Sequence, residues 1–280
     1  MRRVDEPLDL PVLGGYPDPR MLRMPGMERM ELIHEGRSPR PPTHYWCGHV
    51  PTDWSPGRAA FAMPASPWFQ LARGLVTPGI VALPADAALG TAFATTVPAG
   101  TVTTTSELTI NYLRPIRMKR LAARAAVIDA TAYQGLIESS VVDEDGRMVA
   151  HLTSRYITLR PPIELATLTG EIPVSNDPPL EAGLYLRDLA DDDVAAPRDD
   201  LSGLEILART TAGEFKQAPM VRMLGMSLPE FSDGRFTTTV PASRWFTSPA
   251  TTIYGGVTAL ILEIGRDPVV VGWRSAPTAG

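Results

Sequence analysis

Residues 57–69 read GRAAFAMPASPWF, and residues 234–246 read GRFTTTVPASRWF. Both stretches contain Pro-Ala-Ser-x-Trp-Phe, which begins at Pro64 in the first copy and at Pro241 in the second, an offset of 177 positions. Self-similarity at a fixed offset is the signature of an internal repeat. The sequence therefore predicts two copies of one structural unit.

The segment downstream of this motif is the second part of the repeat. Residues 79–95 (GIVALPADAALGTAFAT) are rich in alanine and apolar on nearly every face, which predicts a helix that is buried all round. At the same offset Gly79 corresponds to Gly256, and Asp86 corresponds to Glu263. The match of two carboxylates in one register argues against a chance similarity.

The first copy continues after Gly100, where the second copy ends. Alternating patterns rich in β-branched residues predict four strands after this glycine. An Asp-Gly pair between the last two predicts a hairpin. One buried helix and an antiparallel meander indicate an α+β layer structure. The predicted strands are residues 101–113 (TVTTTSELTINYL), 121–129, 134–142 and 147–159.

Two segments lack periodicity. Residues 1–42 are rich in Pro, Gly and Met, and we expect them to be irregular and to lie over the first copy. Residues 161–203 contain two Pro-Pro pairs and three consecutive aspartates, which is typical of a linker with at most a short helix. The repeat units then occupy residues 43–160 and 204–280.

Composition narrows the class of protein. The 280 residues carry a formal net charge of −5, so there is no basic footprint for nucleic acid. No stretch is apolar for long enough to span a membrane. The one cysteine, Cys47, and the absence of a secretory signal predict a cytoplasmic protein. No pair among the four histidines has metal-ligand spacing, so we expect no metal.

The order of these motifs resembles the hot-dog-fold acyl-CoA thioesterase superfamily, in particular its phenylacetic-acid-degradation (PaaI-like) branch. The resemblance rests on Pro-Ala-Ser-x-Trp, then on a glycine that opens an apolar helix with a carboxylate seven residues later. Glu-Leu-Thr-Ile-Asn-Tyr-Leu-Arg-Pro and Asp-Glu-Asp-Gly-Arg follow. The resemblance implies an α+β hot-dog fold, in which a long helix is wrapped by an antiparallel sheet. We expect two tandem copies of this fold, of which the second is incomplete.

The resemblance also implies site residues at an interface between two hot-dog units. The family places a carboxylate as base or nucleophile, a backbone N–H at a glycine to polarise the thioester carbonyl, and a strand hydroxyl that places water. In the first copy these match Asp86, Gly79 and Thr105, and in the second Glu263 and Gly256, without a hydroxyl counterpart.

The family motif is His-Gly-Gly, and this chain departs from it. In the first copy Thr77 and Pro78 replace the His and the first Gly, so one backbone donor is missing close to the site. In the second copy Tyr254 replaces the His and the glycine pair is intact.

Simpler interpretations stand beside the functional ones. Pro84 suits the first position of a helix, so Asp86 two residues later has the place of a first-turn acid. Thr105 is equally well explained as an ordinary strand residue, because threonine is common in strands. Cys47 lies two residues from His49, an arrangement that serves either a nucleophilic thiol or a small buried side chain.

A basic cluster follows the first long strand and is a candidate site for the phosphates of coenzyme A, with solvated surface charge as the alternative. Coenzyme A would then be part of the substrate, and we expect no separate cofactor. The candidate residues are Arg114, Arg117, Lys119 and Arg120.

Three functions remain open from the sequence. The first is an acyl-CoA thioesterase with carboxylate-assisted hydrolysis, and the second is a non-catalytic acyl or acyl-CoA-binding protein. The third, a hot-dog hydratase or dehydratase, ranks last because no histidine stands near Asp86 or Glu263. Either way we expect a thioester ligand, no nucleic acid or membrane partner, and homo-oligomers that form by hot-dog pairing.

Overall fold

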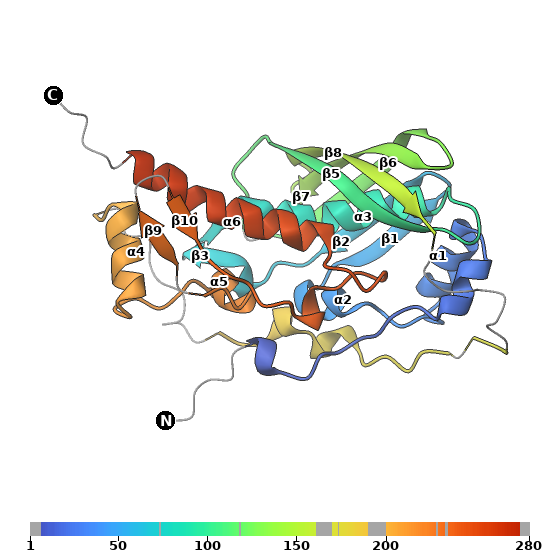
Figure 1. The fold of residues 1–280 in the computed structure, drawn as a ribbon, viewed down its shortest axis with the longest axis horizontal. Helices are drawn as coiled ribbons and strands as arrows, with labels where there is room; N and C mark the ends of the chain where they lie inside the picture. The colour runs from blue at the N-terminus through green and yellow to red at the C-terminus, as the bar shows by residue number, and fades with distance from the viewer. Residues whose placement is uncertain are drawn as a thin grey trace.

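The computed structural model describes residues 7–72, 74–117, 119–160, 170–172, 174–189, 200–227, 229–232 and 235–274. Its core is one antiparallel sheet wrapped around a helix (Figure 1). The sheet has the order β1-β2-β6-β7-β8-β5. Its strands are β1 (Val50–Ser55), β2 (Arg58–Met63), β5 (Val102–Tyr112), β6 (Leu121–Ala130), β7 (Gln134–Asp143) and β8 (Met148–Leu159).

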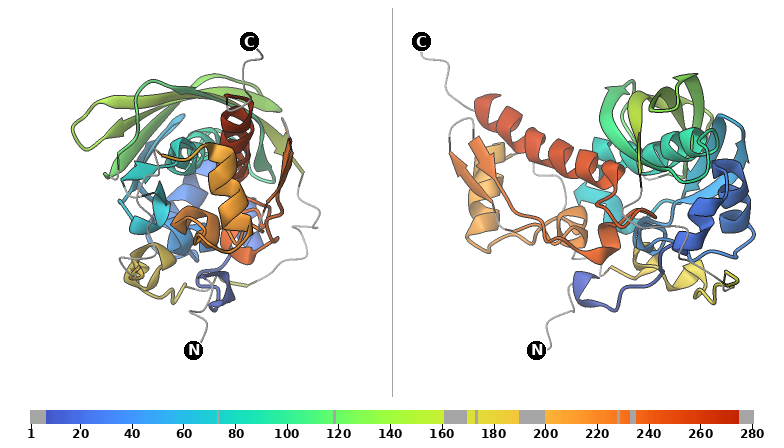
Figure 2. Two further views of the ribbon diagram at one scale, coloured as in Figure 1. Left: turned by 90° about the vertical axis from the view of Figure 1, so that its left-hand side faces the viewer. Right: turned by 45° about the vertical axis from the view of Figure 1, so that its right-hand side comes forward.

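The wrapped helix is α3 (Ala82–Ala94), which follows a single 3-10 turn, η4 (Pro78–Val81). The sheet curves over one side of α3, and helix α6 (Gly255–Arg274) lies along another (Figure 2). Pro84 lies in the first turn of α3, where no backbone donor is required, and this explains the late start of the helix. The α+β arrangement of a buried helix and four long strands is thus confirmed.

The remaining elements are short. The helices are α1 (Gly26–His34), α2 (Pro42–Cys47), α4 (Gly203–Thr211) and α5 (Pro219–Met223). The small strand pairs are β3 (Gln70–Ala72) with β4 (Leu75–Val76), and β9 (Glu230–Ser232) with β10 (Arg235–Thr237). The 3-10 helices are η1 (Pro7–Asp9), η2 (Pro19–Arg23), η3 (Pro67–Phe69), η6 (Leu180–Ala182), η7 (Leu184–Leu186) and η9 (Arg244–Phe246).

Elements of the same kind recur at the offset of the sequence match. At the offset of 177 positions α1 corresponds to α4, α2 to α5, β2 to β10, η3 to η9 and α3 to the middle of α6. In both Pro-Ala-Ser-x-Trp-Phe motifs the serine, Ser66 or Ser243, accepts a hydrogen bond from the tryptophan N–H two residues on. Elements of the same kind thus recur upstream as far as α1 and α4, beyond the stretch in which the sequences match.

The two copies pack on each other reciprocally. Helix α2 contacts η9 of the other copy, and α5 contacts η3. Trp46 on α2 donates from Nε1 to the carbonyl oxygen of Met223 at 3.2 Å and packs edge-on against Phe246, with ring centroids 5.2 Å apart. On the equivalent side the guanidinium of Arg222 lies 5.6 Å from the ring centroid of Trp68. Such exchange of equivalent contacts is the pattern of a two-fold interface.

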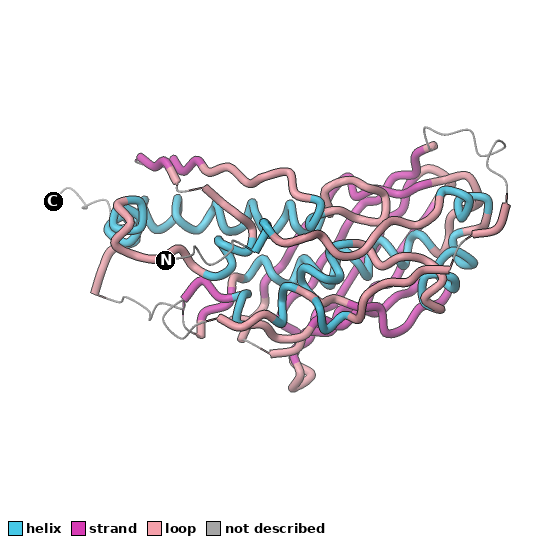
Figure 3. Tube along the Cα trace, turned by 90° about the horizontal axis from the view of Figure 1, so that it is seen from below, coloured by secondary structure: helices cyan, strands magenta, loops and turns pink. Residues whose placement is uncertain are grey.

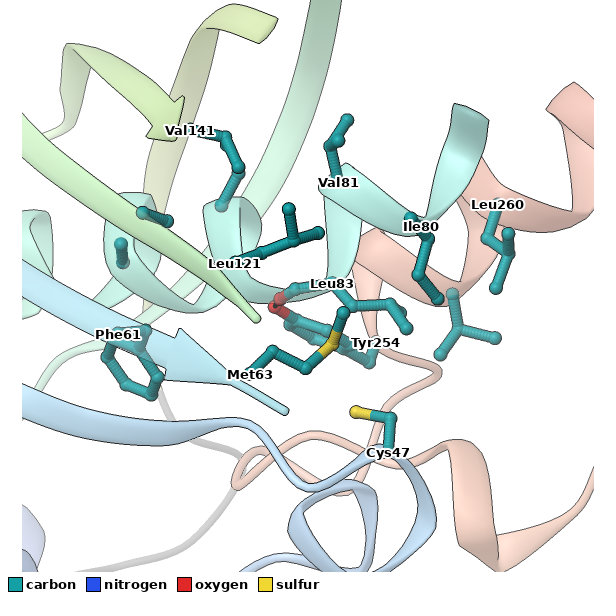
Figure 4. Close-up of a cluster of buried hydrophobic side chains, with 14 of the residues drawn as sticks. Cys47, Phe61, Met63, Ile80, Val81, Leu83, Leu121, Val141, Tyr254 and Leu260 are labelled. Atoms are coloured by element: carbon teal, nitrogen blue, oxygen red, sulfur yellow. Dashed lines mark hydrogen bonds between the residues drawn. The ribbon is translucent and has the colours of Figure 1, made fainter. Parts of the chain in front are cut away.

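The core continues from the sheet into the space between α3 and α6 (Figure 4). Met63 and Leu121 of the sheet, Ile80 and Leu83 around the start of α3, and Leu260 of α6 are buried there. Because the faces of α3 that the sheet does not cover are also apolar, α6 buries area that would otherwise be exposed. Beyond this contact α6 extends past the sheet toward α4 and the β9–β10 pair (Figure 2).

The N-terminal segment, residues 1–42, is less irregular than predicted. Besides two 3-10 helices it contains α1, a nine-residue helix. Residues 1–6 lie outside the described part of the chain. The amide of Gly26 donates to the carbonyl oxygen of Val97 at 2.9 Å, and Arg29 donates to that of Thr101 at 2.8 Å. These bonds fix α1 over the end of α3, where the sequence has no hydrophobic period strong enough to reveal a helix.

The expected linker, residues 161–203, is described only in part, and its first Pro-Pro pair and its acidic run lie outside the described residues. Residues 174–189, the longest described stretch of this segment, are not a free linker. Tyr185 is buried, and its carbonyl oxygen accepts a hydrogen bond from Ser66 at 2.7 Å. The carbonyl oxygen of Arg187 accepts one from Trp68 Nε1 at 2.9 Å. This segment lies across the first copy and satisfies its buried polar groups, a tertiary role that composition does not predict (Figure 1, yellow). Seen from below in Figure 3, loops and helices lie in front of the long strands.

Close approach of the two helices makes one glycine essential. A Cβ on Gly256 would lie 2.6 Å from the carbonyl oxygen of Ala82, a backbone atom that has no side-chain freedom to move away. We expect Gly256→Ala to lower the free energy of unfolding by about 1–3 kcal/mol, the usual cost of overpacking. Chemical denaturation monitored by circular dichroism measures this change.

Gly265→Ala, on the same helix, is the matched control. A Cβ there would meet no atom within 4 Å. The substitution should raise helix stability by up to about 1 kcal/mol because alanine is the better helix former. Equal effects of the two substitutions would contradict the close helix contact.

Candidate functional site

Asp86 lies at the junction of the two copies, on α3 and facing α6. Its side chain is buried, with 2% exposure. Oδ2 accepts a hydrogen bond from the backbone N–H of Gly256 at 2.8 Å, and Oδ1 accepts one from the Thr105 hydroxyl at 3.0 Å. The Tyr156 hydroxyl also donates to Oδ1, at 2.5 Å. None of these donors belongs to the first turn of α3, so the interpretation of Asp86 as a first-turn acid is wrong.

Glu263 occupies the equivalent place on α6. Its Oε2 accepts hydrogen bonds from the backbone N–H of Gly79 at 3.1 Å and from the Thr77 hydroxyl at 2.9 Å. Thr77 is the residue that replaces the family's histidine. Its short hydroxyl reaches the carboxylate of the opposite copy, so this position keeps a polar contact at the site.

The pairing of glycine with carboxylate is therefore crossed between the copies. Matching the motif within each copy places Gly79 with Asp86 and Gly256 with Glu263. In the structure Asp86 pairs with Gly256, and Glu263 pairs with Gly79. Since residue 79 faces 263 and residue 86 faces 256, α3 and α6 run antiparallel. Sequence spacing alone does not reveal this exchange because it depends on how two helices pack.

The glycines before and at the start of the two helices have no side chain, and this allows each carboxylate to come close to the backbone of the other copy. A Cβ on Gly255 would lie 2.8 Å from Asp86 Oδ2, and one on Gly79 would lie 3.1 Å from Glu263 Cβ. The N–H of Gly256 stands at the first turn of α6, where backbone donors have no partner in their own helix and the helix dipole is positive. A carboxylate is the natural acceptor for such a group.

Burial sets the protonation chemistry of the Asp86 site. Burial raises the pKa of Asp86, and hydrogen bonds from Tyr156, Thr105 and Gly256 act in the opposite direction. Burial also raises the pKa of Tyr156 and of Tyr254 well above 10, with the Asp86 charge contributing, so both phenols stay protonated. A desolvated carboxylate with a raised pKa is a stronger base than one in water.

Two tyrosines form hydrogen bonds at this site that the sequence analysis did not predict. Tyr156 lies on the inward face of β8, where an alternating pattern predicts an apolar side chain. Tyr254, which replaces the family's histidine in the second copy, donates from its hydroxyl to the carbonyl oxygen of Leu83 at 2.5 Å (Figure 4). A tyrosine at an inward-facing strand position could have indicated a polar site, but the same pattern is equally typical of a core residue.

Cys47 and His49 are in contact but suit a structural role. The thiol lies 3.2 Å from Nδ1 of His49 and 3.2 Å from the carbonyl oxygen of Thr43. Burial raises the pKa of Cys47 to about 12 and lowers that of His49 to about 3. Both groups are therefore neutral near pH 7, and a thiol in this state is a weak nucleophile.

The basic cluster is spread over the surface near the end of β5. Arg114 donates to the carbonyl oxygen of Met148 at 2.5 Å, and Lys119 forms ion pairs with Asp145 at 2.8 Å and Glu144 at 3.2 Å. Arg117 and Arg120 are exposed. A surface hollow of ≈390 Å³ lies beside the cluster, and it is lined by Pro78, Tyr112, Leu113, Arg114, Pro115 and Ile116.

Pro78 precedes Gly79, so this hollow is on the Glu263 side of the helix pair.

Among the described residues no group of three or more metal-ligating side chains occurs. In the same part of the chain no helix has the length and apolar character needed to cross a membrane.

The family model of the thioesterase superfamily matches residues 74–150. The matched segment contains Gly79, Asp86 and Thr105, and it ends before Tyr156 and Gly256. The superfamily match therefore covers one side of each crossed pair.

Solved structures that match about half of this chain include thioesterase-type proteins. A thioesterase family protein from Silicibacter pomeroyi is 24% identical, with a TM-score of 0.42, over 48% of this chain and 96% of its own. The PaaI protein of the E. coli phenylacetic acid degradation operon is 18% identical, with a TM-score of 0.42, over 49% of this chain and 96% of its own. The comparison with curated proteins gives no match.

The lowered pKa of His49 makes stability depend on pH. In the unfolded chain His49 takes up a proton as the pH falls below 6.5, whereas in the folded protein it stays neutral down to about pH 3. The unfolded state thus binds more protons in this range, and the free energy of unfolding should fall as the pH decreases from 6.5 toward 3. Denaturant titrations of wild type and His49→Gln across this range measure the contribution. An unchanged pH dependence in the variant would contradict it.

Proposed function

We propose that the protein is an acyl-CoA thioesterase-like hydrolase whose working site combines Asp86 and Thr105 of the first copy with Gly256 of the second. The observation that carries this proposal is the 2.8 Å contact between Asp86 Oδ2 and the Gly256 N–H. It brings a carboxylate base and a helix-terminal donor from opposite copies within reach of one small reacting group.

The chemistry follows from the positions of these groups. The Gly256 N–H donates to Asp86 in the structure, so the thioester carbonyl oxygen has to take over this donor. The carboxylate then faces the carbonyl carbon and accepts a proton from water as the water oxygen attacks. Collapse of the tetrahedral intermediate breaks the C–S bond. Asp86 returns the proton to the leaving sulfur, which releases a free acid and a thiol.

Thr105 supports this role because its hydroxyl lies 3.0 Å from Asp86 Oδ1 and provides a second polar group for placing water. The Glu263 site has Thr77 and the Gly79 N–H but no strand hydroxyl from its own copy. We therefore assign hydrolysis to Asp86 and a secondary role to Glu263. Because the base must be ionised, turnover should increase with pH through the raised pKa of Asp86.

Coenzyme A is the proposed carrier, held at its phosphates by the basic cluster. Arg114 lines the ≈390 Å³ hollow, and Arg117 and Arg120 are exposed on the connection between β5 and β6. Lys119 is the weakest candidate since its charge is balanced by Glu144 and Asp145. The cytoplasmic location and the boundaries of the two copies remain predictions from the sequence.

A non-catalytic acyl-CoA-binding protein is the second candidate, and one observation favours it. Both buried carboxylates already accept hydrogen bonds from glycine N–H groups, so in the structure their oxygens are engaged and not directed at a water to be activated. A hydratase or dehydratase is less well supported. His49 packs against Tyr254, with ring centroids 5.6 Å apart, and its hydrogen bond goes to Cys47.

The catalytic assignment predicts different effects of two isosteric substitutions. Asp86→Asn should reduce kcat for acyl-CoA hydrolysis by roughly 100-fold or more, because the base is lost while the size of the side chain is kept. Glu263→Gln is the matched control, with most of the activity retained. Release of free thiol from short-chain, medium-chain and aryl-CoA esters measures both. Loss of turnover in Glu263→Gln alone would move the reaction to the other site, and binding without any turnover would favour the second candidate.

We also propose that the protein forms homo-oligomers. Leu262 on α6 is 68% exposed, whereas its equivalent on α3, Ala85, is buried beneath the sheet. An exposed leucine on a helix of this kind favours association. Size-exclusion chromatography with light scattering should give a mass above one chain, and Leu262→Glu should lower it. A stable monomer at micromolar concentration would contradict this proposal.

A further inference from the structure

Tyr156 and Thr105 form a matched pair on the sheet. They are direct register partners of the antiparallel strands β8 and β5, so their side chains share one face of the sheet. This is the face that covers α3. The register shifts immediately afterwards, between Thr105 and Glu107, where Ser106 is the extra residue of a bulge. The two hydroxyls thus stand side by side at the last regular position before the strand bends.

Both hydroxyls are directed at one carboxylate oxygen. Oδ1 of Asp86 accepts from Tyr156 at 2.5 Å and from Thr105 at 3.0 Å. The Tyr156 oxygen also lies 3.0 Å from the Asp86 carbonyl oxygen. Oδ2 is left for the Gly256 N–H of the other copy. The orientation of the carboxylate therefore follows from which donors hold Oδ1.

The helix leaves room for the phenol at one position. Gly90 lies one turn after Asp86, and a Cβ there would be 3.1 Å from the Tyr156 oxygen and 3.2 Å from its ring. Glycine costs stability in the middle of a helix, so its presence needs a local reason. The reason here is the space that the Tyr156 hydroxyl occupies.

We propose that Tyr156 is the positioning residue of the Asp86 site, holding Oδ1 so that Oδ2 faces Gly256 and the substrate. Tyr156 acts through Asp86 and does not itself contact the reacting atoms. The effect on turnover rests on the proposed hydrolase function, whereas the effect on the carboxylate does not. The titratable groups that interact with Asp86 are Tyr156 of β8 and Tyr254 ahead of α6, both protonated phenols.

Tyr156→Phe removes this hydroxyl and keeps the ring. The hydrogen bond from Tyr156 lowers the pKa of Asp86 against the effect of burial, so its loss should shift the titration of Asp86 to higher pH. Carbon-13 NMR of protein labelled at aspartate carboxyl groups measures this directly, with the Asp86 signal assigned from Asp86→Asn. The acid limb of the kcat profile should move in the same direction. We expect kcat to fall about 10- to 100-fold, with a smaller change in KM.

Tyr254→Phe is the matched control, because it removes an equally buried phenol hydroxyl that bonds to the Leu83 carbonyl oxygen. It should destabilise the protein to a similar extent without the large displacement of the Asp86 titration. Gly90→Ala provides a second variant if Tyr156→Phe folds poorly. Its Cβ would press on the Tyr156 hydroxyl and ring and lengthen the bond to Asp86 while alanine strengthens the helix, so it should shift the titration of Asp86 in the same direction by a smaller amount.

The outcomes separate the two proposals. If Asp86 titrates at the same pH in wild type, Tyr156→Phe and Gly90→Ala, Tyr156 is a core residue only and the positioning role is wrong. If the titration shifts as expected but wild type hydrolyses no thioester, the positioning role holds and the hydrolase proposal fails. A shift of equal size in Tyr254→Phe would also overturn the specific role of Tyr156.

Discussion

The arrangement of this protein depends on two hydrogen bonds that cross between its repeats. Asp86 accepts the N–H of Gly256, and Glu263 accepts the N–H of Gly79. A buried carboxylate without partners would cost several kcal/mol, so each helix needs the N-terminal donors of the other. These bonds fix both the antiparallel direction of α3 and α6 and their register. A shift of either helix by one turn would remove the glycine N–H donor from both carboxylates.

The rest of the molecule is organised around this contact. Helix α3 is apolar on every face, so it needs the sheet on one side and α6 on the other. Reciprocal packing of α2 on η9 and of α5 on η3 supports the helix pair from below with aromatic contacts. In Figure 1 α6 continues beyond the sheet, which packs mainly against α3. The two carboxylates consequently have unlike surroundings although they are equivalent in sequence.

The sequence predicted the parts of the fold that have a local period. The four strands after Gly100, the buried helix with its late start, and the offset between the copies all follow from alternation, composition and self-similarity. It also indicated Asp86 and Thr105, which do meet. It did not indicate α1, because that helix has a weak hydrophobic period and is held by backbone bonds to the loop after α3. The crossed pairing and the role of Tyr156 depend on packing between distant segments, which no local pattern encodes.

The crossed pairing can be tested most directly through the two glycine amides. In ¹⁵N-glycine-labelled protein the amide shift of Gly256 should titrate with Asp86, and that of Gly79 with Glu263, since each N–H donates to that carboxylate. Asp86→Asn should abolish the titration of Gly256 and spare that of Gly79, and Glu263→Gln should do the reverse. If Gly79 follows Asp86 instead, or if neither amide responds to these substitutions, the helices do not exchange donors and the proposed site is wrong.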